Sequence, residues 1–124
     1  MSKDIKLRRE QVADNPQAPV VVLSTAPDNA VARHIAQALV HEGLAACVNL
    51  APPSLSIYQW QGKVEEETEV ALTIKTCADR LPALAERLSG LHPYEVPELL
   101  VLDVTGGTAA YLDWMHEQTR PISS

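Results

Sequence analysis

Several charged and amphipathic residues, from position 60 onward, are of the types that bind small ligands. Tyrosine and tryptophan each offer a flat face with one hydrogen-bonding tip, and a lysine beside a glutamate would orient an anionic or zwitterionic molecule. The candidate ligand-binding set is Trp60, Lys63, Glu65, Lys75, Tyr94 and Glu98. The same residues also suit a network of salt bridges at a hairpin end and a subunit interface, and both interpretations stay open.

An acidic run, Glu65-Glu66-Glu67 followed by Glu69, overlaps this set. We expect it to form a solvated strand face, because clustered like charges repel one another when they are buried. Carboxylate oxygens are also the ligands that hard divalent cations prefer, so the run would attract such ions weakly.

Three of the four histidines, His34, His41 and His116, fall on predicted helices. His34 and His41 are seven residues apart, which is about 10 Å along a helix and too far for two ligands of one ion. We therefore expect these three side chains to have surface or packing roles.

The two cysteines, Cys47 and Cys77, are flanked by apolar residues in or next to predicted strands. They form no C-x-x-C pair, and no adjacent base would activate either thiol. The sequence thus predicts two buried, unreactive thiols in a reducing, cytoplasmic setting.

Composition and motif content exclude several classes of protein. The net charge of -6 would repel a nucleic-acid backbone, and the chain contains no Phe for an RNA-binding aromatic strand. It has no apolar run long enough for a membrane span, and its first residues lack the apolar segment of a secretory signal. Fingerprints of serine hydrolases, zinc proteases and nucleotide-binding loops are absent. We therefore expect no nucleic-acid and no membrane partner.

The elements that position these residues alternate between strand-like and helix-like patterns. The expected order is a strand at 19–25, a helix capped by Asp28 and ending at Gly43, a strand at 46–50, a hairpin from Leu55 to Thr76, a helix capped by Asp79, a strand at 98–104 and a terminal helix. Pro52-Pro53 predicts a bend before the hairpin, and Gln61-Gly62 predicts its tight turn.

This βαββαβ order predicts an α+β fold, a ferredoxin-like sandwich with an extended hairpin between the second and third strands and an additional C-terminal helix. The predicted domain covers residues 19–120. It is preceded by a flexible leader at residues 1–18 and followed by a tail at residues 121–124.

Three segments together resemble the CutA family of divalent-cation tolerance proteins. They are Val20-Val-Val-Leu-Ser-Thr-Ala-Pro-Asp28, Tyr58-Gln-Trp-Gln-Gly-Lys-Val-Glu65 and His92-Pro-Tyr-Glu-Val-Pro-Glu-Leu-Leu100. Two shorter segments lie between them: Leu44-Ala-Ala-Cys-Val-Asn49 comes after the first helix, and Ile74-Lys-Thr76 ends the long arm of the hairpin. All five segments stand in the same order as in the family. The resemblance covers residues 19 to about 120.

The resemblance implies a trimer that is built through the extended hairpin and is linked to divalent-metal tolerance, copper included. It also implies a metal role for His92, which lies in the segment similar to the family's copper-associated histidine motif. Some relatives have two adjacent histidines there and a cysteine in the first strand, where this chain has Leu91 and Ser24. Because Cu(I) prefers sulfur ligands, we expect copper binding to be weak and no cofactor to be required.

The sequence thus predicts a homotrimeric, cytoplasmic binding or signalling protein that responds to divalent metal ions without catalytic turnover. A small molecule or another protein is the expected partner. The alternative is an enzyme or sensor that acts on a small anionic ligand in a cleft between subunits.

Overall fold

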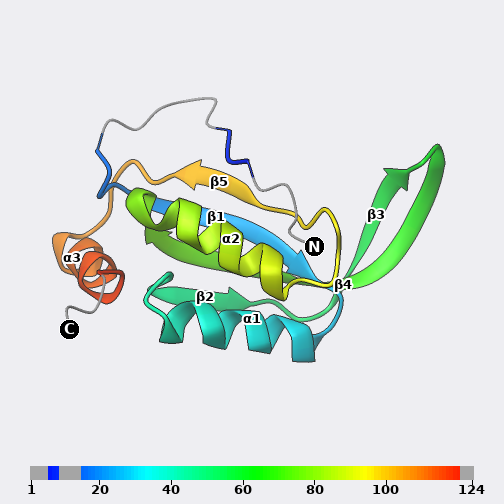
Figure 1. Cartoon of the computed structure of the whole chain (residues 1–124), viewed down its shortest axis with the longest axis horizontal. Helices are drawn as coiled ribbons and strands as arrows, with labels where there is room; N and C mark the ends of the chain where they lie inside the picture. Colours follow the sequence, from blue (N-terminus) through cyan, green and yellow to red (C-terminus); the bar gives the residue numbers. More distant parts are fainter. Residues whose placement is uncertain (1–5, 9–14, 121–124) are drawn as a thin grey trace.

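A computed structural model describes residues 6–8 and 15–120, and its elements follow the predicted order (Figure 1). They are β1 (Pro19–Ala26), α1 (Asn29–His41), β2 (Cys47–Leu50), β3 (Ser54–Trp60), β4 (Lys63–Cys77), the 3-10 turn η1 (Ala78–Arg80), α2 (Leu81–Leu91), β5 (Leu100–Asp103) and α3 (Ala109–Gln118). The strands lie in the order β2-β4-β1-β5, with antiparallel neighbours, and β3 pairs with the outer part of β4. The predicted α+β, ferredoxin-like fold is confirmed.

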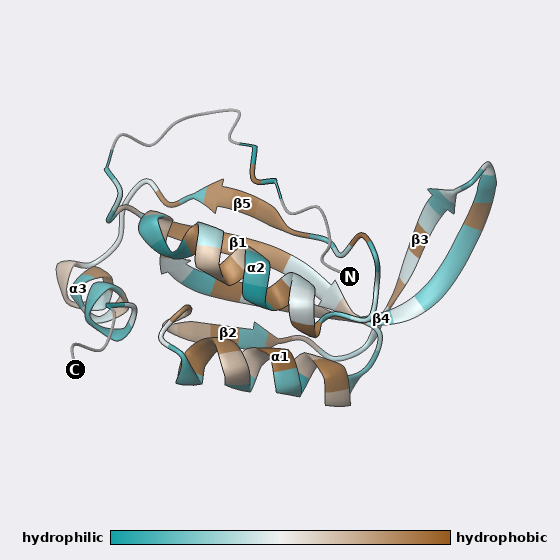
Figure 2. Ribbon diagram, viewed as in Figure 1, coloured by the Kyte–Doolittle hydropathy of each residue, from teal (hydrophilic) through white to brown (hydrophobic). Residues whose placement is uncertain are grey.

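The core lies between one face of the sheet and the two helices α1 and α2 (Figure 1). Alternate residues of β1 are buried, and Val20 and Val22 have no exposed surface. Across from them, Ile35 of α1 and Leu84 of α2 are equally buried. Figure 2 shows that β1 is mainly hydrophobic, whereas the projecting part of β4 is mainly hydrophilic. The opposite face of the sheet, which α1 and α2 do not cover, is called the uncovered face below.

Helix α1 begins and ends as the sequence predicts. The Asp28 carboxylate accepts a hydrogen bond from the Val31 N–H at 2.9 Å, which satisfies one of the free donors of the first turn. At the other end Gly43 has a φ of 71°, and the Leu44 N–H reaches back to the Leu39 carbonyl at 2.9 Å. Glycine adopts this left-handed conformation without steric cost, so it ends the helix at the expected place.

Helix α2 begins differently from the prediction. Its N-cap is Arg80, no side chain caps it, and Pro82 lies in the first turn. Asp79 lies one residue earlier, in η1, and its carboxylate accepts two hydrogen bonds from the Arg120 guanidinium, at 2.6 and 2.9 Å. The prediction that Asp79 caps this helix is therefore wrong, because a bidentate arginine occupies the carboxylate.

The hairpin formed by β3 and β4 projects away from the rest of the domain (Figure 1). Strand pairing with β4 is interrupted between Leu50 and Ser54, where the prolines predicted the bend. The turn residues Gln61 and Gly62 have φ angles of 51° and 80°, which are the positive values of a tight hairpin turn. The hairpin is thus present where the sequence placed it.

The leader and the tail fall largely outside the described residues, so their predicted extents stay predictions. The described part of the leader contacts the domain. The Asp79 N–H donates to the Pro16 carbonyl, the Ala78 N–H donates to the Ala18 carbonyl, and Leu7 packs against the hydrophobic core. Among the described residues, no helix combines the length and the apolar character that a membrane crossing requires.

Candidate functional site

The projecting hairpin brings the middle members of the predicted ligand set onto one face. The strand register places Trp60 opposite Lys63 and Tyr58 opposite Glu65. Residues that lie directly opposite in an antiparallel pair share a face, so Tyr58, Trp60, Lys63 and Glu65 lie together. By the same alternation Glu67 and Glu69 join them, whereas Glu66 points to the other side. This surface, from Trp60 and Lys63 to Glu69, is called the acidic hairpin face.

Tyr94 and Glu98 reach the base of this face from the loop between α2 and β5. The Tyr94 hydroxyl donates to a carboxylate oxygen of Glu69 at 3.3 Å. Burial, together with the charges of Glu69 and Glu67, raises the pKa of Tyr94 to about 12, so the phenol remains a donor at neutral pH. Partial desolvation and the nearby charge of Glu69 also raise the pKa of the Glu98 carboxyl, although the residue as a whole is exposed. Five of the six predicted residues therefore lie on the hairpin or at its base.

Lys75 does not belong to this group. It lies near the opposite end of β4, where its Nζ is 5.8 Å from the centre of the Tyr111 ring of α3. Six residues of extended strand separate it from Glu69, which corresponds to roughly 20 Å. The sequence pattern grouped Lys75 with the other five residues because residue types alone do not show how far apart side chains lie in the folded strand.

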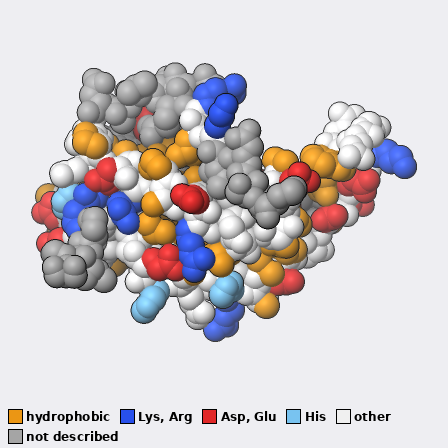
Figure 3. Space-filling view, viewed as in Figure 1, with side chains coloured by type: hydrophobic (Ala, Val, Ile, Leu, Met, Phe, Trp, Pro, Cys, Tyr) orange, Lys and Arg blue, Asp and Glu red, His pale blue; other side chains and the backbone are white. Residues whose placement is uncertain are grey.

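The acidic run is only partly solvated. Glu69 is buried, and Tyr94 covers it, which corrects the expectation of a solvated face at that position. Tyr58 and Glu67 also lie on the acidic hairpin face, although the predicted ligand set does not include them. Their place on this face could have been predicted from the Gln61-Gly62 turn, since a two-residue turn fixes which positions face each other. Figure 3 shows acidic side chains gathered along the hairpin with a basic one at its end.

His92 is buried at the C-terminal end of α2, and both of its ring nitrogens contact backbone groups. Nε2 lies 2.7 Å from the Thr25 carbonyl oxygen, and Nδ1 accepts a hydrogen bond from the Tyr94 N–H at 3.1 Å. This pairing requires a neutral ring with its proton on Nε2. A metal ion would have to displace one of the two contacts to bind His92, so the ring is not set up as a free ligand.

The surroundings of His92 offer few further ligands. Ser24, at the position where some relatives have a cysteine, uses its hydroxyl to donate to the Glu98 carbonyl at 2.8 Å. Within the described residues there is no group of three or more His, Cys, Asp and Glu side chains that could hold a metal ion. These residues do not fit a strong copper site, and the predicted role of His92 stays a prediction.

Comparisons with known proteins agree with the fold and with the sequence segments described above. Residues 20–118 match the family described as CutA1 divalent ion tolerance protein. The chain is 52% identical over 99 residues to the divalent-cation tolerance protein CutA of Thermus thermophilus, an alignment that covers 80% of this chain and 96% of that relative. It is 48% identical over 100 residues to protein CutA of Mus musculus, covering 81% of this chain but only 56% of the longer mouse protein.

A solved structure of the divalent cation tolerance protein Cut A1 from Thermus thermophilus has the same fold. It superposes with a TM-score of 0.81 at 51% identity, and the match covers 82% of this chain and 99% of that one.

Proposed function

The chain belongs to the CutA1 divalent ion tolerance family, and from this premise we propose that it acts as a homotrimeric binding protein in the response to divalent metal ions, without catalytic turnover. The observation that carries the proposal is the projecting hairpin, whose apolar side chains are left largely exposed by the chain's own described residues. A binding or signalling role then depends on surfaces that several copies build together.

The hairpin supports self-assembly because its apolar residues are exposed on the face opposite the acidic one. Leu55, Ile57 and Val64 are 58%, 62% and 70% exposed. Soluble proteins seldom leave such side chains together in water on a long, uncovered strand pair. The uncovered face of the sheet adds Leu100 and Leu102, which are about half exposed. A closed ring of copies would cover both sets at once.

The acidic hairpin face supports a cationic or zwitterionic ligand more than a purely anionic one. It carries Glu65, Glu67 and Glu69 against the single cation Lys63, and the Tyr94 phenol stays uncharged. Oxygen ligands of this kind suit hard divalent cations, whereas copper at His92 would have to compete with backbone hydrogen bonds. We therefore propose that this face attracts divalent cations only weakly, through its negative charge, since its described carboxylates form no group that could hold an ion. No cofactor is needed for folding.

We also propose a cytoplasmic location. Both cysteines are free, with Cys77 buried and Cys47 half-buried. A reducing compartment suits such thiols, and fractionation of cells that express the full chain tests this. Recovery in the periplasmic or secreted fraction would contradict it.

The assembly is tested by light scattering of the full chain over a dilution series. A trimer has about three times the 13.5 kDa chain mass, and we expect this value at micromolar concentration. A constant monomer mass over the whole series would refute the proposed trimer.

A further inference from the structure

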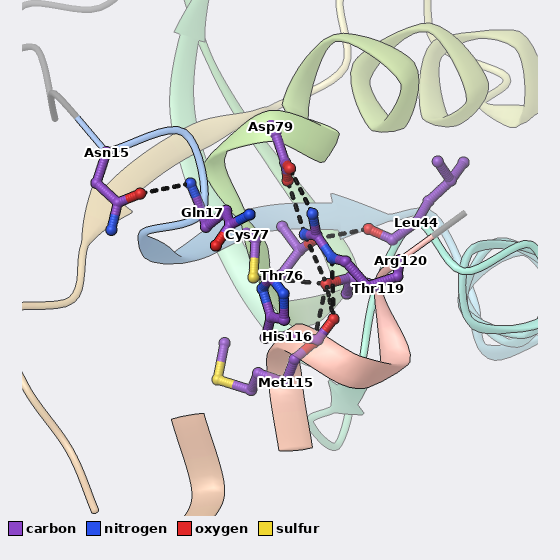
Figure 4. A network of polar contacts seen from close by, with 10 residues as sticks. All are labelled: Asn15, Gln17, Leu44, Thr76, Cys77, Asp79, Met115, His116, Thr119 and Arg120. Carbon is purple, nitrogen blue, oxygen red and sulfur yellow. Dashed lines mark hydrogen bonds and ion pairs between the residues drawn. The ribbon is translucent and has the colours of Figure 1, made fainter. Parts of the chain in front are cut away.

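The leader and the end of helix α3 meet at η1 (Figure 4). On one side, the Asp79 N–H donates a hydrogen bond to the Pro16 carbonyl at 2.6 Å. On the other side, the Asp79 carboxylate accepts two hydrogen bonds from the Arg120 guanidinium, at 2.6 and 2.9 Å. Asp79 therefore joins segments from the beginning and the end of the described domain.

A short turn at residues 15–18 brings the leader into position. The Ala18 N–H donates to the Asn15 carbonyl at 3.0 Å, and the Gln17 N–H donates to the side-chain oxygen of Asn15 at 2.9 Å. The pair Asn15-Pro16 suits such a turn, because the asparagine side chain can bond the backbone two residues on and proline fixes its own φ. With the turn closed, its carbonyl groups lie next to the first N–H groups of η1.

The short segment η1 relies on these outside contacts. It spans three residues, no side chain caps it, and the first N–H groups of any helix lack partners within the helix. The turn supplies two acceptors, since the Ala18 carbonyl accepts from the Ala78 N–H at 2.8 Å and the Pro16 carbonyl accepts from the Asp79 N–H. The position of the Asp79 carboxylate thus depends on the turn before β1.

The end of α3 depends in turn on Arg120. Besides its pair with Asp79, Arg120 donates from Nε to the His116 carbonyl at 3.1 Å. A Cβ placed on Gly43 would lie 3.7 Å from the carbonyl oxygens of Gln118 and Arg120, so the end of α3 also lies against the segment that follows α1. Within α3 itself only Met115 is buried. Contacts at its end are therefore a large part of what holds this helix.

We propose that the turn at residues 15–18 acts as a clamp that holds α3 in place through Asp79. The turn fixes the η1 backbone, η1 presents the Asp79 carboxylate, and the carboxylate holds Arg120. Opening of the turn then loosens α3, because the contacts form one continuous chain between the two segments. Both the turn and Arg120 lie just outside residues 20–118, so the family match does not assign this device.

The clamp has a consequence for assembly. Lys75 alternates with the buried Ile74 and so points to the uncovered face, where its Nζ contacts the Tyr111 ring of α3. Helix α3 therefore lies at one end of the face that we assign to contacts between copies, and loosening it is expected to weaken those contacts. This consequence rests on the proposed function. The clamp does not, so a measurement on α3 itself is valid even for a monomeric chain.

The clamp is tested by amide hydrogen exchange of the full chain, followed residue by residue by NMR. Asn15→Ala removes the side-chain acceptor of the turn and should speed exchange of the Asp79 and Thr119 amides at least about threefold, because both report local opening. The matched control is Gln17→Ala in the same turn, since Gln17 contributes its backbone N–H there and keeps it in the variant. This control should exchange as the native chain does.

A second comparison shows whether the effect passes through Asp79. Asp79→Ala removes the carboxylate that holds Arg120, so it should speed exchange of the Thr119 amide to a similar extent. Adding Asn15→Ala to Asp79→Ala should then give no further increase at Thr119, whereas the amide of residue 79 should still exchange faster. The proposal is overturned if Asn15→Ala leaves Thr119 exchange unchanged, or if the two substitutions multiply their effects there.

Discussion

His92 shows how one side chain can be committed to structure at a position where a ligand role was predicted. Its ring joins the end of β1 to the loop after α2 through contacts with the Thr25 carbonyl and the Tyr94 N–H. It also packs against the Tyr94 ring, with centres 4.8 Å apart. Tyr94 in turn reaches Glu69, so His92 helps to hold the base of the hairpin.

His92→Ala is therefore expected to lower the free energy of unfolding by about 3 kcal/mol, because it leaves buried backbone groups unpaired and opens a cavity. Thermal or urea denaturation measures the change. His34→Ala, an exposed histidine on α1, is the control and should change stability by less than about 0.5 kcal/mol.

Copper binding provides the second measurement on the same variant. Since the native ring is already engaged, calorimetric titration with Cu(II) should give native affinity only modestly above that of His92→Ala. Tight native binding that is lost in His92→Ala would show that His92 is a metal ligand with partners not identified above.

The ion pair of Asp79 and Arg120 gives a prediction for pH. The hydrogen bonds from Arg120 lower the pKa of the Asp79 carboxyl below its ordinary value. A carboxyl whose pKa is lower in the folded state stabilises the fold above its unfolded pKa, and this stabilisation is lost as the pH falls through the folded pKa.

Asp79→Asn should thus lower stability by about 1 kcal/mol at pH 7, and this difference should shrink toward zero as the pH is lowered from neutral to below the ordinary aspartate pKa of about 4. Melting curves of both proteins over this range measure it. Glu86→Gln, which changes an exposed carboxylate of α2, should show no such pH-dependent difference. An Asp79→Asn deficit that does not shrink as the pH falls below the ordinary aspartate pKa would contradict the assigned role of the ion pair.

At the scale of secondary-structure elements, the hairpin of β3 and β4 has two distinct faces. One is acidic and aromatic, and the other presents Leu55, Ile57 and Val64. Strand alternation produces this division, because successive side chains point to opposite sides. The apolar face is the part of the hairpin that we assign to contacts between copies.

Ile57→Asp should then shift the assembly toward monomer at micromolar concentration, because a charge buried in an apolar contact is costly unless it is paired. Sedimentation velocity distinguishes the two states. The matched control is Val40→Asp, which places the same charge on an exposed apolar position of α1. An Ile57→Asp protein that remained as fully trimeric as Val40→Asp would place the interface elsewhere.

At the scale of the whole molecule, the two ends of the sheet carry different chemistry. The hairpin end gathers Glu65, Glu67 and Glu69, and the α3 end carries Lys75 beside Tyr111. The long strand β4 therefore carries Glu65, Glu67 and Glu69 in its projecting part and Lys75 near its other end.

The sequence alone determined the features that depend on neighbouring residues. The Asp28 cap, the Gln61-Gly62 turn and the order of strands and helices all appear where local patterns placed them, because caps, turns and alternation involve residues a few positions apart. The family segments were likewise readable in the chain.

Only the tertiary structure decided which distant residues meet. Asp79 binds Arg120, 41 positions away, instead of capping α2, and His92 contacts Thr25 across 67 positions. Lys75 lies against Tyr111 of α3 and not beside Tyr94. Local propensity carries no information on such contacts, because packing of whole elements sets the distance between side chains that are far apart in the chain.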